Sequence, residues 1–149
     1  MADGLDVIIV DDDPVTCEVL TEIVKTFYTW GDVLAFTDVD QATSYCLNQA
    51  TGVAIFILDV FLETTTGFDF LDAIENRFPM AFQDTIIITG NASNDIVNMC
   101  LVSDITYLLE KPIRSHALQF AVRAIVSKYT KFARRLLLDP IFAENVARV

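Results

Sequence analysis

Polar residues that could carry chemistry follow several short apolar segments of the 149-residue chain. Asp11, Asp12 and Asp13 directly follow the apolar segment that ends at Val10, and they stand before a proline. The other candidates each end or follow a different apolar segment: Asp59, Thr89 and Lys111. Adjacent carboxylates repel one another, so three together suggest a use. They could hold a metal ion, one of them could act as a nucleophile, or they could form an acidic turn that caps a helix.

The chemistry open to this set of residues is narrow. Clustered carboxylates without a soft ligand nearby suit a hard cation, and Mg²⁺ is the natural choice. A carboxylate beside such an ion is also a candidate nucleophile toward phosphorus, which would form an aspartyl phosphate. An ammonium and a hydroxyl group, such as those of Lys111 and Thr89, could then hold the phosphoryl oxygens. Taken singly, each residue has an ordinary structural explanation, so the hypothesis depends on their meeting at one place.

Five short apolar segments, bounded by acidic or turn residues, are typical of buried parallel strands. They span residues 5–11, 33–36, 53–60, 85–89 and 105–110. The segments between them have apolar residues at helical spacing. Five strands, each followed by a helix, predict an α/β fold with an open, doubly wound parallel sheet and right-handed crossovers. Sites in such sheets form at the carboxyl ends of the strands, where all the candidate residues would stand.

Several residues predict where the helices begin and which sides they bury. Asp13 and Pro14 suit the start of the first helix, with Asp13 as the cap. Asp38 with Gln41 resembles a capping box for the second helix, and Ser115 begins a long last helix. The predicted apolar faces are Val15, Val19, Leu20, Ile23, Val24 and Phe27 in the first helix, Ala42, Tyr45, Cys46 and Gln49 in the second, Phe68, Leu71 and Ile74 in the third, and Ile96, Val97 and Cys100 in the fourth.

Together these residues resemble the receiver domain of two-component response regulators, over about residues 5–126. The motifs that carry the resemblance are Asp11–Asp12 after the first strand, Asp59 after VAIFIL with Gly67 eight residues beyond, Thr89 in IIITG, and Lys111–Pro112 in EKPI. Their order and the separations from Asp59 to Thr89 and from Thr89 to Lys111 match the family's usual spacing. The resemblance implies a flavodoxin-like fold with five parallel strands in the order 2-1-3-4-5.

The resemblance also implies a role for each phosphoryl-handling residue. Asp59 would accept a phosphoryl group from the phosphohistidine of a sensor histidine kinase or a phosphotransfer protein. Lys111 would pair with that group, and Thr89 would move to hydrogen-bond it. The Lys111–Pro112 peptide bond would be cis, as in the family. The chain would then be a signalling domain and not an enzyme, apart from its own phosphorylation and dephosphorylation.

The same resemblance implies a magnesium site. Asp11 and Asp12 would hold Mg²⁺ together with Asp59 and the backbone carbonyl group of Phe61. Asp13 would then cap the first helix, so the three adjacent carboxylates would divide between metal binding and helix capping.

Three positions depart from the family pattern. The family commonly has an aromatic residue three positions before the lysine, where this chain has Leu108. Tyr107 lies one residue earlier and should point to the opposite face of the strand. Four residues after the phosphorylated aspartate the family often has proline, where this chain has Glu63, and Phe61 is bulky for its position. These departures leave the phosphorylation chemistry intact and put the usual aromatic switch in doubt.

Two alternatives remain. Asp11 and Asp13 also form the DxD motif of haloacid-dehalogenase-type phosphatases, in which Asp11 would be the nucleophile, with Thr89 and Lys111 holding phosphate. That family needs further metal-binding acids after the lysine, and only Asp139 and Glu144 remain there. The reading also leaves Asp59 unexplained. The second alternative is a vestigial receiver that acts only as a protein interaction module.

Composition and charge narrow the function further. The net charge is −11, but residues 1–111 hold nineteen acidic side chains against three basic ones, which gives −16, whereas residues 112–149 carry +5. The acidic body disfavours nucleic-acid binding. The apolar segments are too short to span a membrane, so we expect no membrane partner. Cys17, Cys46 and Cys100 lack the spacing of a zinc site, so we expect buried thiols in a cytoplasmic protein.

The last helix is longer than one sheet requires, so we divide the chain into a receiver domain, residues 1–127, and a C-terminal helical extension, residues 128–149. Apolar residues along this helix follow a heptad spacing: Leu118, Val122, Ile125, Tyr129, Phe132 and Leu136. The first three should pack on the sheet. The remainder favours a homodimer through this helix, or a linker to an output domain. Asp139–Pro140 should end the helix, before one more short helical segment.

Overall fold

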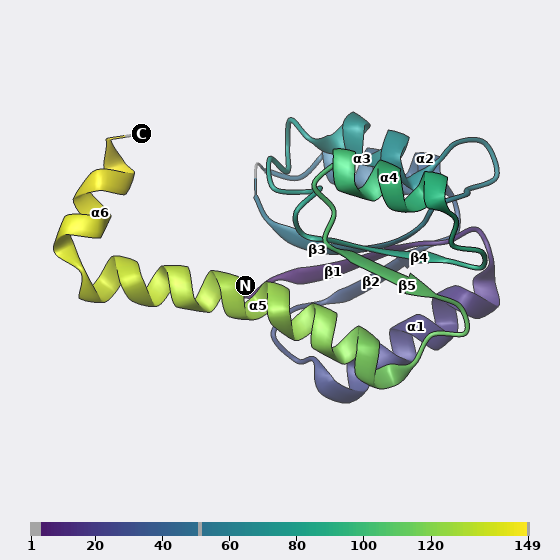
Figure 1. The fold of residues 1–149 in the computed structure, drawn as a ribbon, viewed down its shortest axis with the longest axis horizontal. Helices are drawn as coiled ribbons and strands as arrows, with labels where there is room; N and C mark the ends of the chain where they lie inside the picture. Colours follow the sequence, from purple (N-terminus) through teal and green to yellow (C-terminus); the bar gives the residue numbers. More distant parts are fainter. Residues whose placement is uncertain (1–3, 51, 149) are drawn as a thin grey trace.

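A five-stranded parallel sheet forms the centre of the computed structural model, which describes residues 4–50 and 52–148 (Figure 1). The strands are β1 (Asp6–Val10), β2 (Val33–Phe36), β3 (Ala54–Asp59), β4 (Thr85–Thr89) and β5 (Tyr107–Glu110). Their order is β2-β1-β3-β4-β5, as predicted. The observed strands begin or end one or two residues inside the predicted segments where the two differ. The doubly wound, flavodoxin-like fold is confirmed.

The register of the sheet aligns the ends of neighbouring strands. Val10 of β1 pairs with Leu58 of β3, so the residues that follow them, Asp11 and Asp59, emerge side by side. On the other side of β3, Asp59 pairs with Ile88, and Thr89 follows one position later. Because side chains on a strand alternate between its faces, this register decides which side chains meet at the edge.

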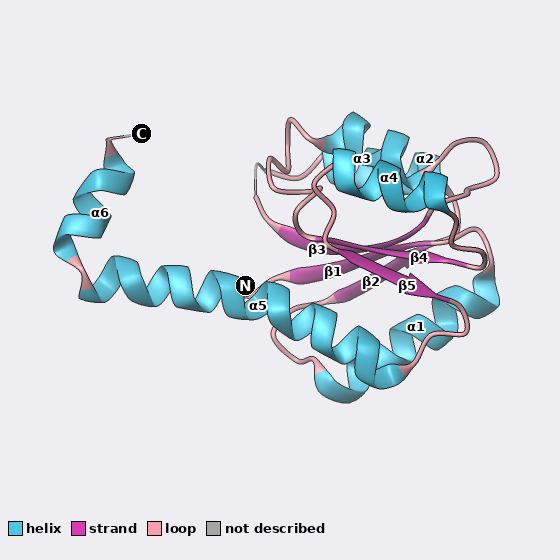
Figure 2. Ribbon diagram, viewed as in Figure 1, coloured by secondary structure: helices cyan, strands magenta, loops and turns pink. Residues whose placement is uncertain are grey.

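Helices cover both faces of the sheet (Figure 2). One face carries α1 (Pro14–Phe27) and α5 (Ser115–Leu138), and the other carries α2 (Val39–Leu47), α3 (Gly67–Ile74) and α4 (Asn94–Val102). Alternate residues of each central strand enter the two resulting cores. In β3, for example, Ile55 and Ile57 pack toward α1 and α5, while Phe56 and Leu58 pack toward the other helices. All six residues of β3 are buried, which explains its unbroken apolar sequence.

Two aspartates cap the first two helices. The Asp13 carboxylate accepts hydrogen bonds from the N–H of Val15 (3.1 Å) and the hydroxyl of Thr16 (2.8 Å). It therefore begins α1 as predicted. The Asp38 side chain accepts from the N–H of Asp40 (2.8 Å) instead of that of Gln41, so α2 has an aspartate cap without the expected capping box.

The buried face of α1 agrees with the predicted one only in part. Leu20 and Val24 are buried as predicted, and Cys17 is buried with them, whereas Val15 and Val19 are 67% and 47% exposed. Both sets have helical spacing, and the small thiol of Cys17 lies where the helix comes close to the end of β1. A similar correction applies to Val97 of α4, which is exposed beside the buried Ile96 and Cys100. The predicted face of α3 is buried as expected.

The last helix, α5, is continuous over 24 residues, as predicted, and its second half extends beyond the sheet (Figure 1). Leu118, Val122 and Ile125 are buried in the core. Asp139 caps the next helix, α6 (Pro140–Ala147), which runs in a different direction from α5. In the described part of the chain, no helix has the length and apolar character needed to cross a membrane.

Candidate functional site

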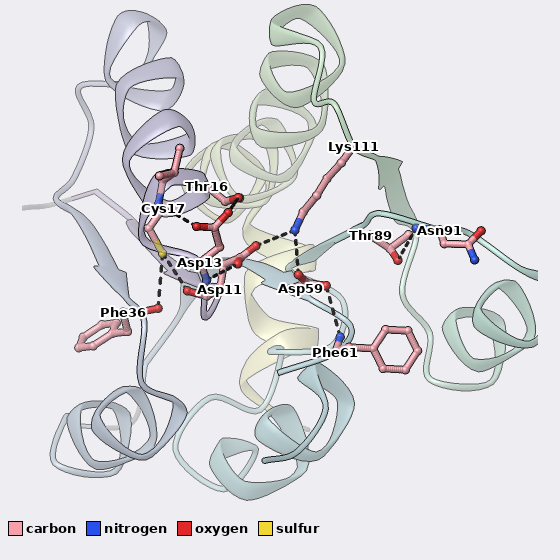
Figure 3. A network of polar contacts seen from close by, with 11 residues as sticks. Asp11, Asp13, Thr16, Cys17, Phe36, Asp59, Phe61, Thr89, Asn91 and Lys111 are labelled. Atoms are coloured by element: carbon pink, nitrogen blue, oxygen red, sulfur yellow. Dashed lines mark hydrogen bonds and ion pairs between the residues drawn. The ribbon is translucent and has the colours of Figure 1, made fainter. Parts of the chain in front are cut away.

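Three charged side chains meet at the carboxyl edge of the sheet (Figure 3). The Nζ atom of Lys111, which follows β5, lies 3.0 Å from Oδ2 of Asp11 and 2.8 Å from Oδ2 of Asp59. Asp11 and Asp59 lie at the ends of neighbouring strands, so the register places their carboxylates together. The lysine partly neutralises two acids that would otherwise repel each other at close range. Asp59 and Asp11, which precede Lys111 by 52 and 100 positions, therefore form one cluster with it, as predicted.

Asp11 is fixed by its surroundings. It is fully buried, and its Oδ1 atom accepts a hydrogen bond from the N–H of Asp13 (2.9 Å). Burial raises its pKa above the ordinary value, although the bonds from Asp13 and Lys111 act in the opposite direction. For Lys111, burial alone would lower the pKa. Its hydrogen bonds to Asp59 and Asp11 outweigh that effect and raise the pKa, so the ammonium group stays charged.

Cys17 supports this corner of the site, a role that no sequence pattern indicated. Its thiol donates to the backbone oxygen of Asp11 (3.1 Å) and contacts that of Phe36 at 3.6 Å. Burial raises its pKa to about 11, so the group remains a neutral donor at physiological pH. All three cysteines are buried and free, as expected.

The predicted metal ligands lie within reach of one ion. Asp11, Asp12 and Asp59 each offer a carboxylate oxygen, and these oxygens all lie within 4.8 Å of one another. Asp11 and Asp59 are buried, whereas Asp12 is exposed and borders a hollow of about 300 Å³ with Asp38, Asp40 and Glu63 among its lining residues. An all-oxygen donor set with one solvent-facing member fits a hard cation such as Mg²⁺, which retains several waters.

The backbone of Phe61 contacts the Asp59 carboxylate. Its N–H donates to Oδ1 of Asp59 (3.3 Å). The residue is 62% exposed, and its ring points away from Asp59 (Figure 3). A backbone bridge joins Phe61 to Thr66, the residue before α3. This bridge holds the loop after Asp59 in place. The Phe61 carbonyl as a metal ligand remains a prediction.

Gly67 begins α3 against the end of β3. A Cβ atom at this position would lie 2.6 Å from the backbone oxygen of Asp59, too close for any side chain. The Gly67 N–H also donates to the backbone oxygen of Val60 (2.9 Å). The close approach gives a physical reason for glycine eight residues after Asp59.

Thr89 is buried at the end of β4, but its hydroxyl lies outside the charged cluster. The Oγ1 atom accepts from the N–H of Asn91 (3.3 Å), and in the described residues it bonds neither Asp59 nor Lys111. The backbone does link the two strands, because the Lys111 N–H donates to the Thr89 oxygen (2.8 Å). The movement of Thr89 toward a phosphoryl group remains a prediction.

The loop after β5 contains the cis peptide bond between Lys111 and Pro112 that the resemblance implied. The sequence does not predict a further contact here. Oε2 of Glu110 accepts a hydrogen bond from the N–H of Ala92, a residue of the loop after β4 (3.3 Å). It joins the loops that carry Thr89 and Lys111.

Tyr107 and Leu108 point to opposite faces of β5, as predicted. Leu108 packs against the core beneath α2, α3 and α4, whereas Tyr107 packs against the core beneath α1 and α5. The position usually occupied by an aromatic residue is therefore filled here by an aliphatic side chain.

The acids required by the phosphatase alternative are occupied elsewhere. Asp13 caps α1, and Asp139 caps α6 by accepting from the N–H of Phe142 (3.0 Å). Glu144 of α6 pairs with Arg148, just after that helix and far from the carboxyl edge of the sheet (Figure 1). Asp59, which that alternative leaves without a role, instead pairs with Lys111 in the charged cluster (Figure 3).

Comparisons with known proteins agree with this geometry. The family model of the response regulator receiver domain matches residues 7–123. A response regulator receiver domain protein (CheY-like) from Methanospirillum hungatei JF-1 is 18% identical, with a TM-score of 0.74 over 87% of this chain and 98% of that one. The signal receiver domain of a putative Luxo repressor protein from Vibrio parahaemolyticus is 22% identical, with a TM-score of 0.72 over 91% and 98%.

A third similar structure is the beryllofluoride-activated NtrC4 receiver domain dimer. It is 21% identical, with a TM-score of 0.71 over 83% of this chain and 98% of that one. No curated protein matches the sequence. The solved structures share the fold, and the family match covers most of the chain. The chain therefore belongs to the response regulator receiver domain family.

Proposed function

We propose that Asp59 accepts a phosphoryl group from the phosphohistidine of a sensor histidine kinase or phosphotransfer protein, and that the chain signals by changing conformation. Receiver domains are signalling domains of two-component systems, which gives the general class. The observation that carries the proposal is the position of the Lys111 ammonium group, which contacts both Asp11 and Asp59 at the carboxyl edge of the sheet.

In the proposed reaction, an Asp59 carboxylate oxygen attacks phosphorus. A new O–P bond forms as the N–P bond of the donor breaks, and the imidazole leaves with the bonding electron pair. Lys111, already 2.8 Å from Asp59, would pair with a phosphoryl oxygen. The Thr89 hydroxyl would turn from the N–H of Asn91 toward another phosphoryl oxygen. Hydrolysis of the aspartyl phosphate would then reset the chain.

Asp11, Asp12 and Asp59 would hold Mg²⁺, together with the carbonyl group of Phe61. Their mutual spacing and all-oxygen chemistry fit such an ion. When bound, Mg²⁺ would supply positive charge that offsets the charge of the phosphoryl oxygens. Asp11 offers a carboxylate held in place by Asp13, whereas Asp12 is exposed on the solvent side.

The two alternatives have weaker support. A phosphatase that used Asp11 would have a fully buried nucleophile, whereas the Asp59 side chain is 13% exposed. A vestigial module would not need the buried carboxylates and lysine to be kept together at one edge. The contacts of Asp59 favour the phosphoacceptor.

We also propose how the chain is organised and what it contacts. Residues 1–127 would form the receiver, and residues 128–149 an extension that contacts a second copy or leads to an output domain. The charge of −16 over residues 1–111 opposes nucleic-acid binding by the body. The free thiols fit a reducing compartment, so we place the protein in the cytoplasm.

Incubation with a small acyl phosphate and Mg²⁺, followed by mass measurement of the intact chain, tests the proposal. We expect one phosphoryl adduct on the native chain and none on Asp59→Asn. Asp13→Asn is the matched control, because the Asp13 side chain only caps α1 and the substitution keeps the backbone N–H that bonds Asp11. An adduct of undiminished amount on Asp59→Asn would contradict the proposed acceptor, and no adduct on the native chain would favour the vestigial module.

A further inference from the structure

The part of α5 beyond the sheet exposes apolar side chains that no described residue covers. Leu137 and Leu138 are 83% and 75% exposed. Neither leucine occupies one of the heptad positions that the sequence predicts to be available for pairing. Of those, Tyr129 is partly buried and bonded to Asp84, and Phe132 packs edge-on against Phe142 of α6 but is still 45% exposed. The most exposed apolar side chains of this stretch therefore lie beside the predicted seam.

The cations along the same stretch fall into two groups. Lys128 pairs with the buried Asp84, and Arg135 lies 3.6 Å from Asp139 with its guanidinium group over the Phe142 ring. Lys131 and Arg134 have no acidic partner in the described part of the chain. We call the surface formed by Lys131, Arg134, Leu137 and Leu138 the basic face.

Direct pairing of two basic faces would bring like charges together. Lys131 and Arg134 flank the exposed leucines, and this surface has no acidic side chain of its own to offset them. Like charges placed opposite each other across an interface oppose association. A partner surface for the basic face should therefore be apolar in its floor and acidic at its rim.

The chain has such a surface between α3 and α4. A groove of about 350 Å³ is lined by the acids Asp69, Asp72, Glu75 and Asp104 and by the exposed side chains of Met99 and Val102. Phe68 and Phe82 lie beneath them. None of the four acids pairs with a cation among the described residues. We call this surface the acidic groove.

A chain cannot fill its own acidic groove. The groove lies on the face of the sheet opposite α5, and the extension projects away from the body (Figure 1). A second copy can supply the basic face from outside. If each copy inserts its extension into the other, the two identical contacts close into a symmetric dimer, the commonest form of homo-oligomer.

We propose that the basic face of one chain docks in the acidic groove of a second copy, reciprocally. Leu137 and Leu138 would lie toward Met99 and Val102, and Lys131 and Arg134 would meet the acidic rim. The contact deepens the proposed self-association through the last helix. It does not depend on phosphorylation of Asp59.

Charge reversal in the full chain tests the contact by sedimentation at low salt. The groove variant is Asp72→Lys with Glu75→Lys, and the face variant is Lys131→Glu with Arg134→Glu. The control is Glu18→Lys with Glu22→Lys on the exposed side of α1, which changes the net charge as much as the groove variant does. Melting of each variant verifies that it is folded.

We expect the native chain and the control to dimerise. The groove variant and the face variant should each dimerise at least about tenfold more weakly. An equal mixture of the groove and face variants should form a mixed dimer, and a chain with all four changes should recover self-association. Undiminished dimerisation of the folded groove variant would overturn the docking site and point to another contact through the last helix. A native chain that stays monomeric at high concentration would overturn both, with the Asp59 proposal unaffected.

Discussion

The backbone oxygen of Asp59 lies against Gly67, so closely that a Cβ atom on the glycine would approach it to 2.6 Å. Both groups belong to backbone that is held in place, Asp59 by the sheet and Gly67 by the first turn of α3. A side chain at residue 67 would therefore push the end of β3 and α3 apart. The proposed acceptor would move with its strand.

Gly67→Ala should lower the free energy of unfolding by about 1–3 kcal/mol, the usual cost of overpacking. It should also slow phosphorylation by an acyl phosphate, because Asp59 would be displaced relative to Lys111. Gly90→Ala is the matched control for stability, since a Cβ atom there meets nothing within 4 Å. Denaturant unfolding of both variants measures the difference. Equal stability of the two would mean that α3 shifts without cost.

Mg²⁺ should stabilise the folded chain, because the three carboxylates come together only in the folded state. The gain should be about 2.7 kcal/mol at a concentration one hundred times the dissociation constant. Asp12→Asn should remove most of this gain, and Asp13→Asn should leave it nearly intact, since Asp13 bonds Val15 and Thr16. Melting with and without Mg²⁺ distinguishes them. Equal losses would show that the wrong pair of aspartates has been assigned.

A third buried carboxylate anchors α5 at the opposite edge of the sheet. Asp84 precedes β4 and is almost fully buried, and it accepts hydrogen bonds from the Tyr129 hydroxyl and the Lys128 ammonium group. Burial raises the pKa of Tyr129, and its bond to Asp84 raises it further. A raised pKa in the folded state contributes stability that is complete below the unfolded value of about 10. That contribution is lost as the pH rises through the folded value.

Tyr129→Phe should therefore cost about 1–2 kcal/mol at neutral pH, because the buried carboxylate loses one donor. The cost should shrink above about pH 10, where the native chain loses its own advantage. Tyr107→Phe serves as the control, since the Tyr107 hydroxyl makes no hydrogen bond within the described residues. Unfolding as a function of pH measures both. A difference between Tyr129→Phe and the native chain that persists unchanged to about pH 12 would argue against the bond to Asp84.

Switching should proceed without rotation of an aromatic ring on β5. Leu108 occupies the usual aromatic position, and Tyr107 is packed toward α1 and α5. With beryllofluoride as a phosphoryl mimic, we expect the Thr89 signals in nuclear magnetic resonance spectra to shift while the Tyr107 ring keeps its environment. A change of Tyr107 from packed to exposed would show that the aromatic role has moved by one residue.

The parts of the structure that follow from local pattern could be predicted from the sequence. Buried strands produced unbroken apolar segments, and Asp13 before Pro14 indicated the start of α1. The order of motifs then indicated that Asp11, Asp59 and Lys111 would meet. Periodicity indicated Leu20 and Val24 correctly but could not set the limits of the buried face of α1, because Val15 and Val19 also have helical spacing.

Contacts between distant parts of the chain could not be predicted in this way. Asp84 and Tyr129 are 45 residues apart, and their hydrogen bond depends on where α5 crosses the edge of the sheet. In the sequence, Cys17 cannot be distinguished from an ordinary apolar position of α1. Its hydrogen bond to the Asp11 backbone depends on how closely α1 approaches the end of β1. The repulsion expected among the site carboxylates is also reduced, because Lys111 contacts two of them.

The most direct test of the central claim is to locate the phosphoryl group on the chain. After incubation with Mg²⁺ and an acyl phosphate, reduction with borohydride converts an aspartyl phosphate into homoserine, which peptide mass analysis can place. We predict homoserine at position 59 in the native chain and at no other aspartate. Homoserine at position 11, with position 59 unchanged, would contradict the account.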